Sequence, residues 1–160
     1  LGSARSHAGL AARYALASGA GFHVLDYRLA PEHPRPAALE DALAAWDELS
    51  GVGERLGLAG DSAGGGLSLA LAVALRDLGA RVPAAVAITG PWCDLTLAGE
   101  SMTTRAGEEI MLSRAGLAQD ADRYRGARDA ADPAVSPLFA DLAGLPPFFV
   151  QVGTHEVLLD

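Results

Sequence analysis

The chain of 160 residues has the length of a single domain, and its composition of half apolar and one-fifth charged residues disfavours disorder. Its net charge of -8 disfavours nucleic acid and anionic membrane surfaces as partners, because phosphate recognition needs a basic face. Cys93 is the only cysteine, so no internal disulfide can form. Neither a secretory leader pattern nor a membrane-spanning run of about 20 apolar residues is visible, and we expect a cytoplasmic location.

The first quarter of the chain predicts a helix, a strand and a loop. Leu10, Tyr14 and Ala17 recur at helical spacing, and Gly19 is typical of a helix end. The mostly apolar segment 22–27 predicts a short strand. Three prolines in residues 31–36 then require an extended or turning loop before the next helix.

The remaining elements alternate between helices and strands. Helices are expected over 38–49, 63–78 and 111–124, and strands over 55–60, 83–90 and 148–153. The strands are almost continuously apolar, which indicates that both faces of their sheet are covered. No two-residue hairpin turns separate them, so we predict the α/β class: a parallel sheet flanked by helices on both faces.

A G-x-S-x-G motif, Gly60 to Gly64, lies between a predicted strand and a predicted helix. This is the setting of a nucleophile elbow, in which Ser62 occupies a strained turn above the carboxyl edge of the sheet. We expect any residue larger than glycine at position 60 or 64 to collide with a neighbouring element. The Ala63 N–H, in the first helical turn, is then placed as an oxyanion donor.

Two other interpretations of this motif are a simple turn and a phosphate-binding loop. The simplest is a glycine-rich turn that only joins a strand to a helix. A phosphate-binding loop would require a lysine, and the chain contains none. The strand before Ser62 and the helix after it favour a nucleophile elbow.

Five motifs follow one another along the chain: DYRLAPEHPRPAALEDA, GDSAGGGL, PWCDLTL, SPLFADLAGLPP and QVGTHEVLLD. Together they resemble the hormone-sensitive-lipase-like branch of the α/β-hydrolases, the bacterial carboxylesterases with the GDSAG signature. The resemblance covers essentially the whole chain. It implies part of an α/β-hydrolase fold and serine-dependent hydrolysis of small-molecule carboxylic esters with short acyl chains. It also implies no metal and no organic cofactor.

The resemblance assigns the acid of the catalytic triad to the end of the chain. The family pattern G-x-x-[D/E]-x-L-x-D matches residues 153–160 and places Glu156 at the acid position. Asp160, the second carboxylate of the pattern, is the rival. The alternative for Glu156 is an exposed carboxylate at a helix start, where the helix dipole favours negative charge.

None of the four histidines fits the family's catalytic base, which follows the acid after one further helix and strand. We therefore expect packing or solvent-exposed roles for His7, His23, His33 and His155, and a base outside this sequence. A His-Gly-Gly-Gly loop with further oxyanion donors is expected just upstream of Leu1. The strand before that loop would lie between segments 22–27 and 55–60 in the family's sheet.

We thus expect residues 1–160 to be the central part of one α/β-hydrolase domain, lacking N-terminal strands and the C-terminal strand. Residues 97–130 are expected to form a more polar helical insertion near the pocket. An amidase or deacetylase would use the same triad chemistry. Further alternatives are a non-catalytic small-molecule-binding protein, as in the gibberellin receptors that resemble this branch, and an inactive truncated fragment. No oligomeric state follows from the sequence.

Overall fold

Three parallel strands form the centre of the protein in a computed structural model, which describes residues 2–51 and 55–160. They are β1 (Leu58–Asp61), β2 (Val86–Thr89) and β3 (Phe148–Gln151), paired in the order β1-β2-β3. Gly60 lies opposite Ile88, and Ile88 lies opposite Val150. The parallel sheet predicted from the apolar strands is therefore confirmed, with all three carboxyl ends at one edge.

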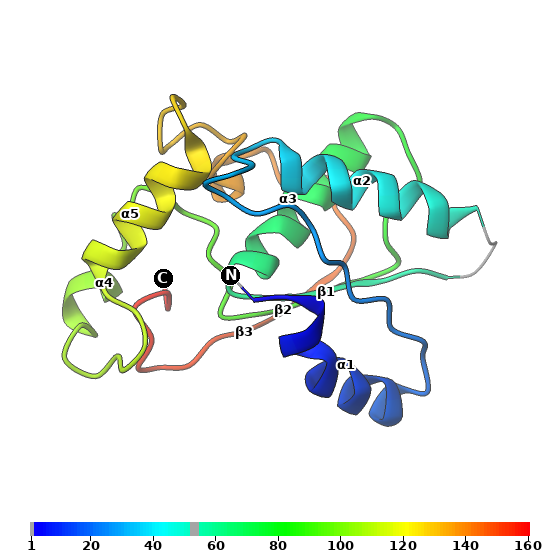
Figure 1. Cartoon of the computed structure of the whole chain (residues 1–160), viewed down its shortest axis with the longest axis horizontal. Coiled ribbons are helices and arrows are strands. Elements are labelled where there is room, and N and C mark those ends of the chain that lie inside the picture. Colours follow the sequence, from blue (N-terminus) through cyan, green and yellow to red (C-terminus); the bar gives the residue numbers. More distant parts are fainter. Residues whose placement is uncertain (1, 52–54) are drawn as a thin grey trace.

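Helices cover both sides of these strands. The helices are α1 (Ala4–Ser18), α2 (Ala37–Ser50), α3 (Ala63–Asp77), α4 (Ser101–Thr104) and α5 (Arg114–Arg125), with a 3-10 turn η1 (Pro137–Phe139). Figure 1 shows α2 and α3 on one side of the strands and α1 on the other. The predicted α/β class is confirmed. Helix α5 begins later than position 111 because the Ser113 hydroxyl accepts a hydrogen bond from the Gly116 amide and caps the first turn.

The predicted strand over 22–27 is wrong for the described structure, in which Phe22 to Tyr27 belong to no strand. A strand is stable only when a neighbour pairs with its backbone, and no described strand pairs with this segment. Side chains hold its far end instead. The Asp26 carboxylate accepts a hydrogen bond from the Ala4 amide, and the Arg28 amide donates one to Asp41.

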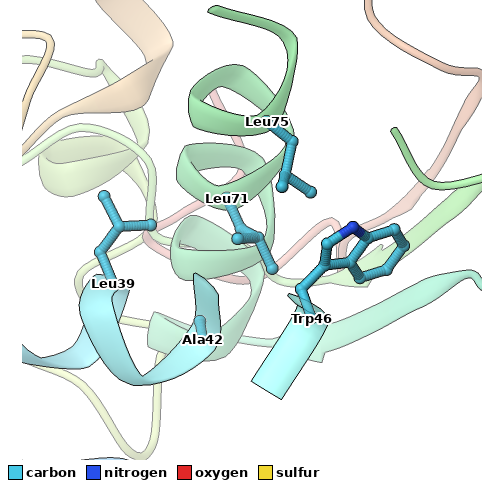
Figure 2. Packing of buried hydrophobic residues seen from close by; sticks show 5 residues of the cluster. All are labelled: Leu39, Ala42, Trp46, Leu71 and Leu75. Atoms are coloured by element: carbon cyan, nitrogen blue, oxygen red, sulfur yellow. The ribbon is translucent and has the colours of Figure 1, made fainter. Parts of the chain in front are cut away.

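The largest apolar cluster fixes helix α3 in place. Leu39, Ala42 and Trp46 of α2 pack against Leu71 and Leu75 of α3, as Figure 2 shows. The Trp46 indole N–H donates a hydrogen bond of 2.8 Å to the Arg81 carbonyl. The opposite side of α3 packs on the sheet through a cluster of Ala72, Val86 and Ile88. Because α3 is held from both sides, its first turn has a fixed place at the carboxyl end of β1.

A second cluster connects the segment after β2 to the end of the chain. Leu97, Met102 and Leu117 pack around Val157, of which only 2% is exposed. Helices α4 and α5 lie within residues 97–130, so this segment is anchored beside the residues that follow β3. Among the described residues, no helix is both long and apolar enough to cross a bilayer.

Candidate active site

Ser62 occupies a strained turn between β1 and α3. Its backbone angles are φ 51° and ψ -121°, a conformation that costs a non-glycine residue about 1–3 kcal/mol. Two hydrogen bonds to the end of β2 and the residues just after it hold this turn in place. The Ser62 amide donates a hydrogen bond of 2.9 Å to the Thr89 carbonyl, and the Ser62 carbonyl accepts one of 2.9 Å from the Trp92 amide. The backbone therefore has the form expected of a nucleophile elbow.

Steric crowding requires glycine at position 60 but not at position 64. A Cβ on Gly60 would lie 2.3 Å from the Gly64 carbonyl oxygen, whereas a Cβ on Gly64 would have no described atom within 4 Å. Among the described residues, the prediction of a collision at Gly64 is therefore wrong. Gly65 and Gly66 are the crowded positions instead, because the chain after β2 passes directly over the first turn of α3. A Cβ on Gly66 would lie 2.2 Å from the Trp92 carbonyl oxygen.

Gly66→Ala is expected to lower the free energy of unfolding by about 1–3 kcal/mol, because the added methyl group meets a backbone carbonyl that has no room to yield. Urea unfolding of a protein containing these residues measures the change. Gly107→Ala is the control, since a Cβ there has no described atom within 4 Å. It should stay within about 0.5 kcal/mol of the parent. Equal stabilities for the two variants would contradict the contact with Trp92.

Ala63 is the first residue of helix α3. The first amides of a helix have no intrahelical acceptor, so the Ala63 N–H is available next to Ser62. Its role as an oxyanion donor stays a prediction.

Glu156 lies at the same edge of the sheet as Ser62. Its Oε1 accepts a hydrogen bond of 2.8 Å from the Gly153 amide. Its Oε2 would lie 2.8 Å from a Cβ added to Gly90, so the carboxylate packs against the residue that follows β2. Because Thr89 binds the Ser62 amide and Gly90 contacts Glu156, one dipeptide contacts both predicted catalytic residues.

Asp160 has a different environment. Its Oδ2 accepts a hydrogen bond of 2.6 Å from the Ser101 amide at the start of α4. A Cβ on Gly99 would lie 2.9 Å from the same oxygen, so the carboxylate fits closely against this turn. Asp160 therefore joins α4 to the end of the chain, which favours Glu156 as the acid.

The four histidines lie in different places. The His7 Nε2 is 3.3 Å from the Asp61 Oδ1, so His7 contacts the residue before Ser62, while its Nδ1 is 3.2 Å from the Ser3 carbonyl oxygen. His155 contacts the Glu108 carboxylate, which lowers the pKa of Glu108. His23 and His33 are exposed. Sequence reasoning missed the His7–Asp61 pair, because the two residues lie in segments that only the fold brings together.

Cys93 follows Trp92, which binds the elbow. A cysteine acts as a nucleophile only as a thiolate. Burial raises the pKa of Cys93 to about 11. The thiol is therefore protonated at neutral pH, which disfavours Cys93 as a nucleophile.

The comparison with a protein family decides the assignment of the fold. The family model described as an α/β-hydrolase fold matches residues 1–160. The chain belongs to this family. The resemblance to its hormone-sensitive-lipase-like branch is confirmed by solved structures. An esterase from the bacterial hormone-sensitive lipase family is 44% identical with a TM-score of 0.95, over all of this chain and 55% of that chain. A hormone-sensitive lipase from a metagenome library is 38% identical with a TM-score of 0.93, over 99% of this chain and 55% of that one.

Curated relatives carry related names. An acetyl-hydrolase of Streptomyces hygroscopicus is 48% identical over all of this α/β-hydrolase chain and 54% of its own length. A putative acetyl-hydrolase of Mycobacterium tuberculosis is 43% identical over all of this chain and 53% of its own length. The chain thus spans about half the length of the curated relatives it matches.

Proposed function

We propose that residues 1–160 are the central part of a serine carboxylesterase that hydrolyses small esters with short acyl chains. The observation that carries the proposal is the convergence of Ser62 and Glu156 on the Thr89–Gly90 dipeptide at the carboxyl edge of the sheet. Relatives named acetyl-hydrolase and esterase support the reaction class and a small acyl group.

The proposed reaction is an acyl transfer in two stages. The Ser62 hydroxyl oxygen bonds to the ester carbonyl carbon, and its proton passes to a histidine outside these 160 residues. Glu156 accepts a hydrogen bond from that histidine and stabilises its charged form. The Ala63 N–H, with donors from outside the chain, binds the oxyanion. The alcohol leaves with the proton, and water then releases the acid from Ser62.

An enzyme accounts for Ser62 and Glu156 better than a binding protein does. A receptor on the same fold has no chemical need for a strained serine and a carboxylate at one edge of the sheet, and fold alone does not decide between the two. A cytoplasmic location stays a prediction, as does the placing of residues 97–130 near the pocket.

The full-length protein containing these residues should hydrolyse p-nitrophenyl acetate and butyrate. We expect kcat/KM to be at least about 10-fold lower for the palmitate ester, because even one methylene more than a pocket accommodates can change kcat/KM about 10-fold. Saturable binding of butyrate esters without release of p-nitrophenol would contradict the enzyme and favour a receptor.

The 160-residue chain expressed alone is expected to lack ester turnover and to melt in a broad transition. It lacks the proposed base, and apolar side chains are exposed along its unpaired segment 22–27 and on strand β3, including Phe22 at 39% and Phe149 at 65%. Thermal unfolding and dye binding measure this. A sharp cooperative melt with Ser62-dependent turnover would contradict it, and would mean that one of the four histidines is the base.

A further inference from the structure

The turn that carries Glu156, residues 153–160, is held by a segment about fifty residues earlier in the chain. We propose that Ser101 and Glu109 are positioning residues for Glu156: they fix both polar groups of Val157 and so place the carboxylate that precedes it. The inference rests on the proposed function, in which Glu156 is the triad acid. Neither residue belongs to a motif that suggested this role.

Ser101 binds this turn through both its hydroxyl and its amide. The hydroxyl donates a hydrogen bond of 2.7 Å to the Val157 carbonyl and accepts one of 3.5 Å from the Asp160 amide. The Ser101 amide donates one of 2.6 Å to the Asp160 carboxylate. Only 2% of Ser101 is exposed, so water has no access to replace the hydroxyl. Without it, the Val157 carbonyl would be a buried acceptor without its partner, which is a costly state.

Glu109 binds the other side of the same residue. One carboxylate oxygen accepts hydrogen bonds from the Met111 amide at 2.8 Å and the Leu112 amide at 3.2 Å. The other oxygen lies 3.4 Å from the Val157 amide nitrogen and accepts its hydrogen bond. These backbone donors, Met111 first, lower the pKa of Glu109, which therefore stays charged at neutral pH. The charge strengthens each of its hydrogen bonds.

These contacts constrain Glu156 directly, because the Val157 amide belongs to the peptide bond between the two residues. The Val157 side chain is anchored among Leu97, Met102 and Leu117, and 2% of it is exposed. The side chain, amide and carbonyl of Val157 are thus all fixed by residues 97–117. A displacement of about 1 Å at a reacting group can reduce the rate of an enzyme about 100-fold.

The test compares Ser101→Ala and Glu109→Gln with Thr104→Ala in the full-length protein. Thr104 is the matched control: it is exposed, lies in the same helix as Ser101, and its hydroxyl bonds only to the Glu100 carbonyl of that helix among the described contacts. Fluorophosphonate titration counts active sites, so kcat is expressed per competent site. Loss of folded protein alone therefore does not change the result.

We expect Ser101→Ala and Glu109→Gln to lower kcat per titrated site about 10- to 100-fold, with KM within a factor of about two. The acid limb of the kcat/KM profile should also move to lower pH. A well-placed carboxylate raises the pKa of its histidine, so a displaced one lets that pKa fall. Thr104→Ala should keep the parent kcat and the parent position of the acid limb.

The outcomes separate this inference from the proposed function. If Glu156→Gln is inactive while Ser101→Ala and Glu109→Gln keep the parent kcat and pH limb, the positioning role is overturned and the triad acid stands. If Glu156→Gln keeps parent activity, the acid assignment fails and the positioning role fails with it. If Ser101→Ala gives no titratable sites, Glu109→Gln alone tests the proposal, through its kcat per titrated site and the acid limb of its kcat/KM profile. Glu109 is only half-buried.

Discussion

Ser62→Ala in the full-length protein is expected to lower kcat for p-nitrophenyl butyrate by about 10⁴-fold or more, since removal of a triad nucleophile leaves only binding and oxyanion stabilisation. Binding should survive, so KM should change little. The fold should survive as well. At φ 51° serine and alanine bear the same backbone strain, and the bonds that hold this turn come from its main chain.

Ser50→Ala is the matched control for this experiment. Ser50 ends helix α2, and its hydroxyl bonds only to the nearby Asp47 carbonyl among the described contacts. The variant should keep parent activity. Turnover by Ser62→Ala within a few-fold of the parent would contradict the role of Ser62.

Glu156→Gln is expected to lower kcat by about 10²- to 10⁴-fold, because an amide neither holds the histidine in its productive tautomer nor stabilises its charge. Its size is close to that of glutamate, so the packing against Gly90 and the bond from the Gly153 amide should remain. Steady-state kinetics on p-nitrophenyl butyrate measure the loss.

Asp160→Asn tests the rival acid in the same assay. Asp160 binds the Ser101 amide at the start of α4, so this variant should mainly lower the melting temperature. A large loss of kcat in Asp160→Asn together with near-parent activity in Glu156→Gln would show that the register after β3 is wrong.

Local features of the sequence predicted much of the fold. The apolar runs, the helical spacing and the glycines around Ser62 are local features of the sequence. Helices α1, α2, α3 and α5 and the three strands follow them, whereas the short helix α4 was not predicted. The same local evidence predicts a strand over segment 22–27, which the described structure does not form. Strand pairing depends on two segments, so the periodicity of one segment cannot show whether a second strand lies beside it.

The site was predicted less completely, for a related reason. Ser62 and Glu156 stand in local patterns, but the groups that hold them come from remote segments: Thr89 and Trp92 for the elbow, Ser101 for the acid turn. The sequence predicts a steric requirement for glycine at position 64, but the structure has it at position 66, because the Trp92 carbonyl lies over the helix there. No spacing in the sequence indicates such contacts.

The role of Ser62 is tested most directly by locating the covalent adduct of a fluorophosphonate probe on the full-length protein. We predict a single phosphonylated residue, Ser62, identified by peptide mass spectrometry, with labelling lost in Ser62→Ala and retained in Ser50→Ala. An adduct on any other residue, or labelling that persists in Ser62→Ala, would contradict the assignment of Ser62 as the nucleophile.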